Sequence, residues 1–89
     1  MKNQLLTREV LTEKWFEPSY INEDGDMYWH NKDGLLHSIG DRPAIIYSNG
    51  SKHWFKNGKR HRDGDKPAII YSNGNKWWYK NGKFIRNSL

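Results

Sequence analysis

The segment Asp41-Arg42-Pro43-Ala44-Ile45-Ile46-Tyr47-Ser48-Asn49-Gly50 returns further along the chain as Asp65-Lys66-Pro67-Ala68-Ile69-Ile70-Tyr71-Ser72-Asn73-Gly74. Nine of these ten residues are identical, and the tenth exchanges Arg for Lys. The similarity continues through residues 52–59 and 76–83. A weaker copy lies upstream, where Pro18, Gly25 and Trp29 correspond to Pro43, Gly50 and Trp54. A nearly fixed period is typical of tandem structural units, so we expect three units over residues 18–42, 43–66 and 67–89.

Each unit contains the signals of two β-hairpin turns. Residues 44–47 form a short β-branched and aromatic run directly after a proline, which is typical of a strand. Asn49-Gly50 follows, then residues 52–56, then a second turn at Asn57-Gly58. Asn-Gly pairs between such runs are strong hairpin signals. The sequence therefore predicts a mainly β fold, an antiparallel meander of about eight short strands.

Residues 1–17 precede the units and carry a different pattern. Leu6 with Val10, and Leu11 with Trp15, repeat at i, i+4, which favours a short helix that ends before Pro18. Thr and Val are weak helix formers, so an extra strand stays open as the alternative. In either form we expect this segment to pack on the sheet.

The composition excludes several classes of protein. The chain has five Trp and five Tyr but few aliphatic residues and no Cys. The core must therefore be aromatic, and neither a disulfide framework nor a thiolate zinc site is available. No apolar run approaches the roughly 18 residues of a membrane span, and no signal-type stretch follows Met1. We expect no membrane span and a cytoplasmic location, which is the host cytoplasm if a phage encodes the chain.

Charge is distributed unevenly along the chain. Residues 1–40 carry four basic and seven acidic side chains, a balance of −3, whereas residues 41–89 carry eleven basic and three acidic ones, a balance of +8. A basic half can attract nucleic acid, anionic lipid or an acidic protein surface.

The second and third units resemble a known repeat. Tyr47-Ser48-Asn49-Gly50, followed by Trp54-Phe55-Lys56-Asn57-Gly58-Lys59, is similar to a MORN-type repeat. The Gly-Asp-x-Pro-Ala starts at residues 40–44 and 64–68 are closer to a variant that occurs in arrays in phage and giant-virus proteins. The period of this chain is slightly longer than that of MORN repeats. The resemblance implies a meandering sheet with a role in protein contact and assembly, in some members lipid binding, and no shared catalytic residues.

No constellation in the sequence indicates catalysis or metal binding. The four histidines lack His-x-His or His-Glu-x-x-His spacing, and His37 and His61 occupy equivalent positions in the period. Asp-Gly pairs are ordinary turn chemistry, and Asp41 and Asp65 are expected to accept backbone hydrogen bonds ahead of the prolines. We therefore expect no enzyme activity, no metal and no cofactor.

The remaining candidate is a basic and aromatic surface or its rim. The predicted partner-binding residues are Lys52, Trp54, Lys56, Lys59, Arg60, Arg62, Lys76, Trp77, Tyr79, Lys80, Lys83 and Arg86. We expect a non-enzymatic protein that contacts a host protein or nucleoprotein complex, as an inhibitor of a host defence nuclease of the anti-CRISPR or anti-restriction kind. Single-stranded nucleic-acid binding is the first alternative, since cations track phosphates while bases stack on rings. A structural or oligomerising element, including a homodimer, is the second.

Overall fold

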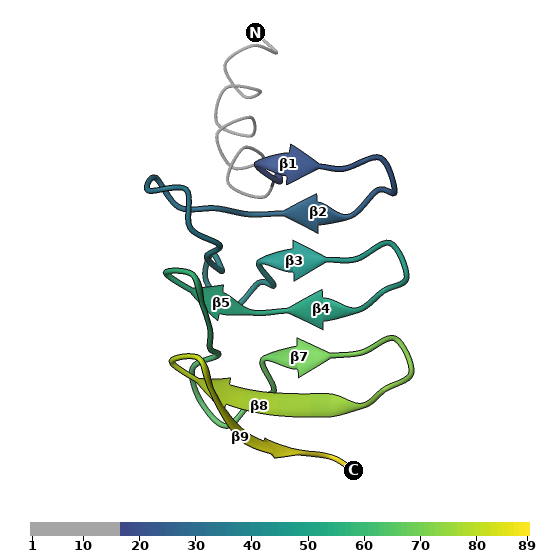
Figure 1. The fold of residues 1–89 in the computed structure, drawn as a ribbon, viewed down its shortest axis with the longest axis vertical. Helices are drawn as coiled ribbons and strands as arrows, with labels where there is room; N and C mark the ends of the chain where they lie inside the picture. Colours follow the sequence, from purple (N-terminus) through teal and green to yellow (C-terminus); the bar gives the residue numbers. More distant parts are fainter. Residues whose placement is uncertain (1–16) are drawn as a thin grey trace, which may run out of the picture.

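Asp-Gly and Asn-Gly turns fold residues 17–89, the part described by this computed structural model, into a stack of β-hairpins (Figure 1). The main sheet contains, in spatial order, β1 (Tyr20–Ile21), β2 (Met27–Tyr28), β3 (Ile45–Ile46), β4 (Lys52–His53), β7 (Ile69–Ile70), β8 (Lys76–Lys80) and β9 (Lys83–Asn87). A separate hairpin pairs β5 (Phe55–Lys56) with β6 (Lys59–Arg60). All strand pairs are antiparallel. The predicted mainly β meander is confirmed, with nine strands and no helix in residues 17–89.

The helix or strand predicted for the N-terminal segment falls on residues 1–16, which lie outside the described residues. Within residues 17–89, no helix has the length and apolar character needed to cross a membrane.

The two kinds of Asn-Gly turn use their asparagines differently. At Asn57-Gly58 both residues have positive φ, 50° and 85°, as a type I′ hairpin turn requires. At Asn49-Gly50 only the glycine does, with φ of 96°. There the Asn49 side chain instead accepts a hydrogen bond of 2.8 Å from the backbone N–H of Ser51. In the second and third units the first turn is therefore a wider loop held by an asparagine side chain, whereas the second is a tight two-residue turn.

The central strand of the second unit is interrupted at Trp54. β4 ends at His53 and β5 begins at Phe55. The Trp54 N–H still donates to the carbonyl of Ala68 in the next unit at 2.7 Å, but Phe55 then pairs with Arg60 of its own unit. The equivalent Trp29 N–H donates to the Ala44 carbonyl at 2.8 Å. The hairpin β5–β6 consequently leaves the main sheet. This unit therefore consists of a hairpin in the main sheet followed by a side hairpin.

Cross-strand pairing assigns the side chains to two faces of the sheet. Ile45 pairs with His53, His53 pairs with Ile69, and Ile69 pairs with Trp77, and directly opposed residues point to the same side. We name this side the aromatic face, made of Tyr20, Tyr28, Tyr47, His53, Phe55, Arg60, Tyr71, Trp77, Tyr79 and Phe84. The other side, the rear face, carries Lys52 opposite Ile46 and Ile70.

The core is small and lies directly beneath the aromatic face. Ala44, Ile45 and Phe55 form its buried cluster. Tyr28, Leu36 and Tyr47 pack against that cluster while remaining half-buried. Because these rings both cover the core and meet the surface, the same residues stabilise the sheet and shape its exposed side.

Candidate functional site

The rings of the aromatic face contact one another edge to face. Ring centroids lie 5.1 Å apart for Tyr47 and His53, 5.9 Å for His53 and Tyr71, and 6.3 Å for Tyr71 and Trp77. The corresponding interplanar angles are 76°, 90° and 85°. Edge-to-face pairs at this spacing are favourable beyond the area they bury. The rings therefore fix each other's orientation and present a preorganised surface.

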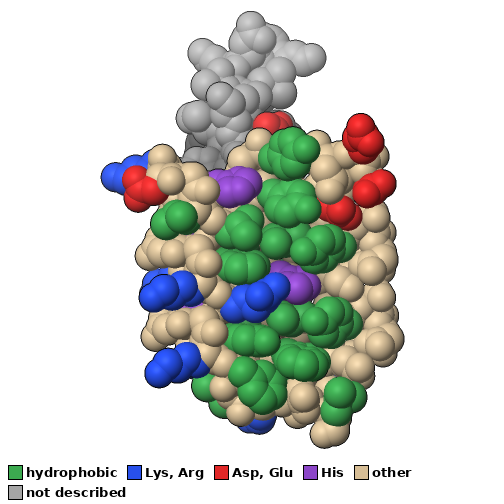
Figure 2. Space-filling model, viewed as in Figure 1, with side chains coloured by type: hydrophobic (Ala, Val, Ile, Leu, Met, Phe, Trp, Pro, Cys, Tyr) green, Lys and Arg blue, Asp and Glu red, His purple; other side chains and the backbone are tan. Residues whose placement is uncertain are grey.

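Much of this ring system is open to solvent. Tyr20 is 56% exposed, Tyr71 37% and Phe84 51%. Figure 2 shows a band of hydrophobic side chains down the molecule that is interrupted near the middle by a cationic side chain and a histidine. An extended apolar band on the surface is characteristic of a contact site.

Arg60 and His53 are the polar members of the aromatic face. An N–H at Nη2 of Arg60 lies 3.3 Å from Nδ1 of His53. The Arg60 guanidinium carbon lies 5.2 Å from the centre of the Phe55 ring and 5.9 Å from that of Tyr79. Its Nε is buried and has no hydrogen-bond partner in the described part of the chain. A cation on the apolar surface is thus held by rings, with much of its hydrogen-bonding capacity unused.

His53 is held in its neutral form by this environment. It is 5% exposed, and its burial, with a further contribution from the charge of Arg60, lowers its pKa to about 4. Burial penalises the imidazolium, and a neighbouring cation penalises it further. At neutral pH the His53 Nδ1 can therefore accept the Arg60 hydrogen bond.

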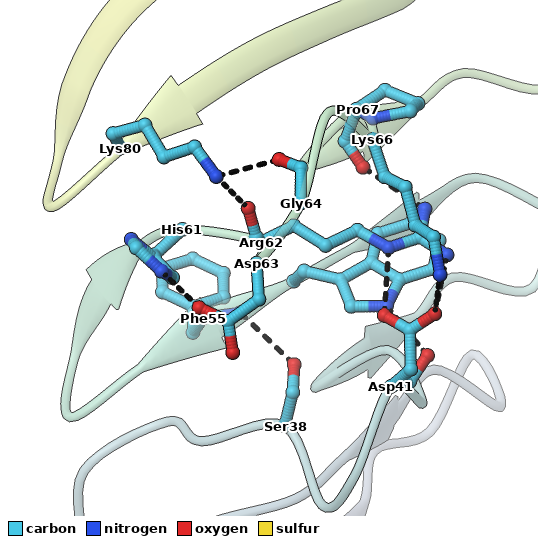
Figure 3. Close-up of polar contacts among 11 residues, drawn as sticks. Ser38, Asp41, Phe55, His61, Arg62, Asp63, Gly64, Lys66, Pro67 and Lys80 are labelled. Atoms are coloured by element: carbon cyan, nitrogen blue, oxygen red, sulfur yellow. Dashed lines mark hydrogen bonds and ion pairs between the residues drawn. The ribbon is translucent and has the colours of Figure 1, made fainter.

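A second cluster, on the other side of the sheet, centres on Arg62 and Asp41 (Figure 3). Arg62 donates from Nε and Nη2 to the two carboxylate oxygens of Asp41 at 2.9 and 3.1 Å, and from Nη1 to the Pro67 carbonyl at 3.1 Å. Its guanidinium lies 3.8 Å from the centre of the Trp54 ring. Lys66 donates to the same carboxylate. Hydrogen bonds from Arg62 and then Lys66 hold the pKa of Asp41 well below its ordinary value.

The same arrangement recurs at the equivalent positions one unit later, with fewer hydrogen bonds. Arg86 lies 4.1 Å over the Trp78 ring and donates to Asp65 at 3.1 Å. Asp41 and Asp65, for which the sequence predicts backbone partners, thus accept hydrogen bonds from arginine side chains. Recurrence at equivalent positions indicates that these clusters join the segments, which is a structural role.

His37 and His61 also have equivalent partners. Nδ1 of His37 accepts the backbone N–H of Asn57 at 3.1 Å, and Nδ1 of His61 accepts that of Asn81 at 3.0 Å. Each histidine therefore supports the following tight turn. Both line a shallow pocket of about 350 Å³ whose wall includes Trp54, Phe55 and Lys56. Within residues 17–89 no group of three or more His, Asp or Glu side chains is arranged to hold a metal ion.

The structure distributes the twelve predicted partner-binding residues over both faces. Arg60, Trp77 and Tyr79 belong to the aromatic face. Trp54 is buried, at 4% exposure, beneath Arg62. Arg62, Lys80 and Arg86 are engaged, because Lys80 donates to the carbonyls of Arg62 and Gly64 at 2.6 and 2.7 Å and both arginines pair with aspartates. The exposed cations away from the aromatic face are Lys52, Lys56, Lys59, Lys76 and Lys83.

Sequence reasoning did not select several members of the aromatic face, namely Tyr20, Tyr28, Tyr47, His53, Phe55, Tyr71 and Phe84. Alignment of the three units could nevertheless have identified two of the positions on this face. His53 is equivalent to Tyr28 and Trp77. Arg60 is equivalent to Leu36 and Phe84, and the two polar departures from this apolar pattern contact each other.

Comparisons of the chain with protein-family models, with curated proteins and with solved structures found no match.

Proposed function

We propose that this chain is a non-enzymatic recognition module that binds another protein through its aromatic face. The observation that carries the proposal is the interlocked ring surface, which is partly open to solvent and holds Arg60 at its centre. Tyr, Trp and Arg are the residue types that contribute most to protein interfaces. Rings already fixed by their neighbours lose little conformational entropy on binding.

The arrangement of rings and charges favours a protein over single-stranded nucleic acid. Consecutive rings stand nearly perpendicular, with angles of 76°, 90° and 85°, whereas bases need accessible flat ring faces beside a track of cations. Arg62 and Arg86 already pair with carboxylates on the other side of the sheet. Direct nucleic-acid binding is therefore one outcome that the test must detect.

We extend the proposal to an inhibitor that contacts a host defence nuclease complex. The support for this extension is the resemblance of residues 40–83 to repeat arrays of phage and giant-virus proteins, together with a basic C-terminal half. Expression of the chain in cells that carry a restriction or CRISPR system should raise the plating efficiency of a targeted phage. Unchanged plating across such systems would contradict the extension.

Matched variants on the two faces test the recognition proposal. Tyr71→Asp places a charge in the middle of the aromatic face, and Lys52→Glu reverses a charge on the rear face as the control. Affinity capture followed by binding measurements with each purified partner should show a loss of about tenfold or more for Tyr71→Asp alone. Loss in Lys52→Glu alone, or retention of labelled DNA or RNA that falls steeply with salt, would contradict protein recognition by the aromatic face.

A further inference from the structure

Arg60 occupies a position that is apolar in the neighbouring segments. Its equivalents are Leu36 and Phe84, and Phe84 packs on Trp77 with ring centroids 5.3 Å apart. In the second segment the corresponding pair is Arg60 and His53, joined by a hydrogen bond. The fold therefore accepts two apolar side chains here, and the polar pair is not required by the architecture.

The charge of Arg60 has no carboxylate partner within residues 17–89. Arg62, Lys66 and Arg86 each pair with an aspartate, whereas His53 is the hydrogen-bond partner of the Arg60 side chain in the described part of the chain. Arginine presents five N–H donors in a planar fork that fits the two oxygens of a carboxylate. A half-buried guanidinium that lies between the Phe55 and Tyr79 rings is already partly desolvated, so an added carboxylate meets a preorganised charge.

Resting on the proposed function, we propose that Arg60 is the receptor for a single Asp or Glu carboxylate of the partner protein, inserted among the rings of the aromatic face. The carboxylate accepts N–H donors of the Arg60 fork. Apolar groups beside it cover Tyr71, Trp77 and Phe84. His53 contributes Nδ1 as a neutral acceptor that orients the guanidinium, because its ring is fixed between Tyr47 and Tyr71. The recognised chemistry is one acidic side chain flanked by apolar or aromatic residues.

The surroundings of Arg60 favour one carboxylate over a polyanion. The side chains that contact it are the uncharged His53, Phe55 and Tyr79. Successive phosphates would need a row of free cations along this face, whereas Lys56 and Lys59 point to the opposite side of the β5–β6 hairpin from Phe55 and Arg60. One isolated positive charge in an apolar surface specifies a single matching negative charge and excludes partners that leave it unpaired.

A displayed library of random linear peptides selected on the intact protein tests this inference. Binders are first sorted by loss of binding to Tyr71→Asp, which identifies those that use the aromatic face. Their affinities are then measured for wild type, for Arg60→Leu, which carries the Leu36 residue type, and for Arg60→Lys. Amide NMR spectra establish that each variant is folded.

We expect the face-dependent peptides to share one Asp or Glu. Its change to Asn or Gln should weaken binding to wild type about tenfold and binding to Arg60→Leu less than about twofold. Arg60→Lys should show an intermediate loss, since it keeps the charge without the fork. Face-dependent peptides without an acidic residue, or with equal losses on both proteins, would overturn the carboxylate receptor and leave the proposed function standing. A library with no face-dependent binder would overturn both.

Discussion

The guanidinium of Arg62 lies 3.8 Å from the centre of the Trp54 ring and also binds both carboxylate oxygens of Asp41. One side chain thus covers a buried ring and links Asp41, at the end of the first unit, to Pro67, at the start of the third. We predict that Arg62→Ala lowers the free energy of unfolding by about 2–3 kcal/mol, since it removes charged hydrogen bonds and a desolvated cation–π contact. Urea denaturation measures this, and Arg86→Ala, which removes a more exposed copy, should cost about 1 kcal/mol. Equal effects of the two variants would contradict the assigned role.

Asp41 makes part of the folding stability sensitive to low pH. Its pKa is held below the ordinary value by Arg62 and Lys66, so its contribution is complete above about pH 4 and is lost as the pH falls further. Asp41→Asn should therefore lower Tm at neutral pH and lower it progressively less in strong acid, as the pH falls from the ordinary carboxyl pKa toward the lowered pKa of Asp41. Thermal scans under both conditions check this. A constant difference between the two proteins would exclude titration of Asp41 as the cause.

His53 gives stability a second pH dependence with its own range. Its pKa is lowered to about 4 by burial and by Arg60, so between about pH 6.5 and pH 4 the unfolded chain binds a proton that the folded chain does not. Stability should fall as the pH drops through this range, by up to roughly 3 kcal/mol. His53→Phe, which restores an aromatic residue at this position, should remove that slope. If the variant and wild type lose stability in parallel across this range, His53 is not the titrating group.

The tight turn at Asn57-Gly58 requires left-handed backbone at both residues. Gly58→Ala should destabilise the protein by about 1 kcal/mol or more, because φ is 85°. Asn57→Gly accepts the same φ and should cost less than Gly58→Ala, although it removes the exposed hydrogen bond that the Asn57 side chain accepts from Asn31 at 3.0 Å. Chemical denaturation of the pair checks the turn, and a neutral Gly58→Ala would contradict it.

The double variant Arg60→Leu/His53→Phe should make the protein more stable. It removes a buried Nε that has no partner in residues 17–89 together with the histidine that hydrogen-bonds Arg60, and it supplies the residue type found at Leu36. Replacing both members of a buried polar pair with fitting apolar groups should add about 1 kcal/mol. Denaturation midpoints measure the gain. A clear loss of stability would show that the pair of Arg60 and His53 supports the fold rather than a contact with a partner.

The Asn-Gly turns made most of the fold predictable. They mark where the chain reverses, and the β-branched run at residues 44–47 and its copy mark where it extends. The break at Trp54 was not predictable from alternation, because there the chain exchanges pairing with the next segment for pairing with Arg60 of its own segment. A local sequence pattern indicates that a segment forms a strand, but it does not indicate which neighbouring segment pairs with that strand.

The candidate site was harder to predict for a related reason. Arg60 and Arg62 are separated by one residue, so a continuous strand would place them on one face. β6 ends at Arg60, however, and the chain turns before Arg62 reaches Trp54 on the rear face. The predicted basic rim is therefore divided between two sides of the sheet.

The order of strands in the main sheet follows the order of the chain, and each segment bonds to the next through antiparallel strand pairing that includes one tryptophan N–H. This architecture does not fix the number of segments, because each segment contacts only the segments directly before and after it. Duplication of a single segment within a gene would add one hairpin to the main sheet and lengthen the aromatic face accordingly. The reach of such a protein toward larger partners can thus evolve by copying, without redesign of the parts already present.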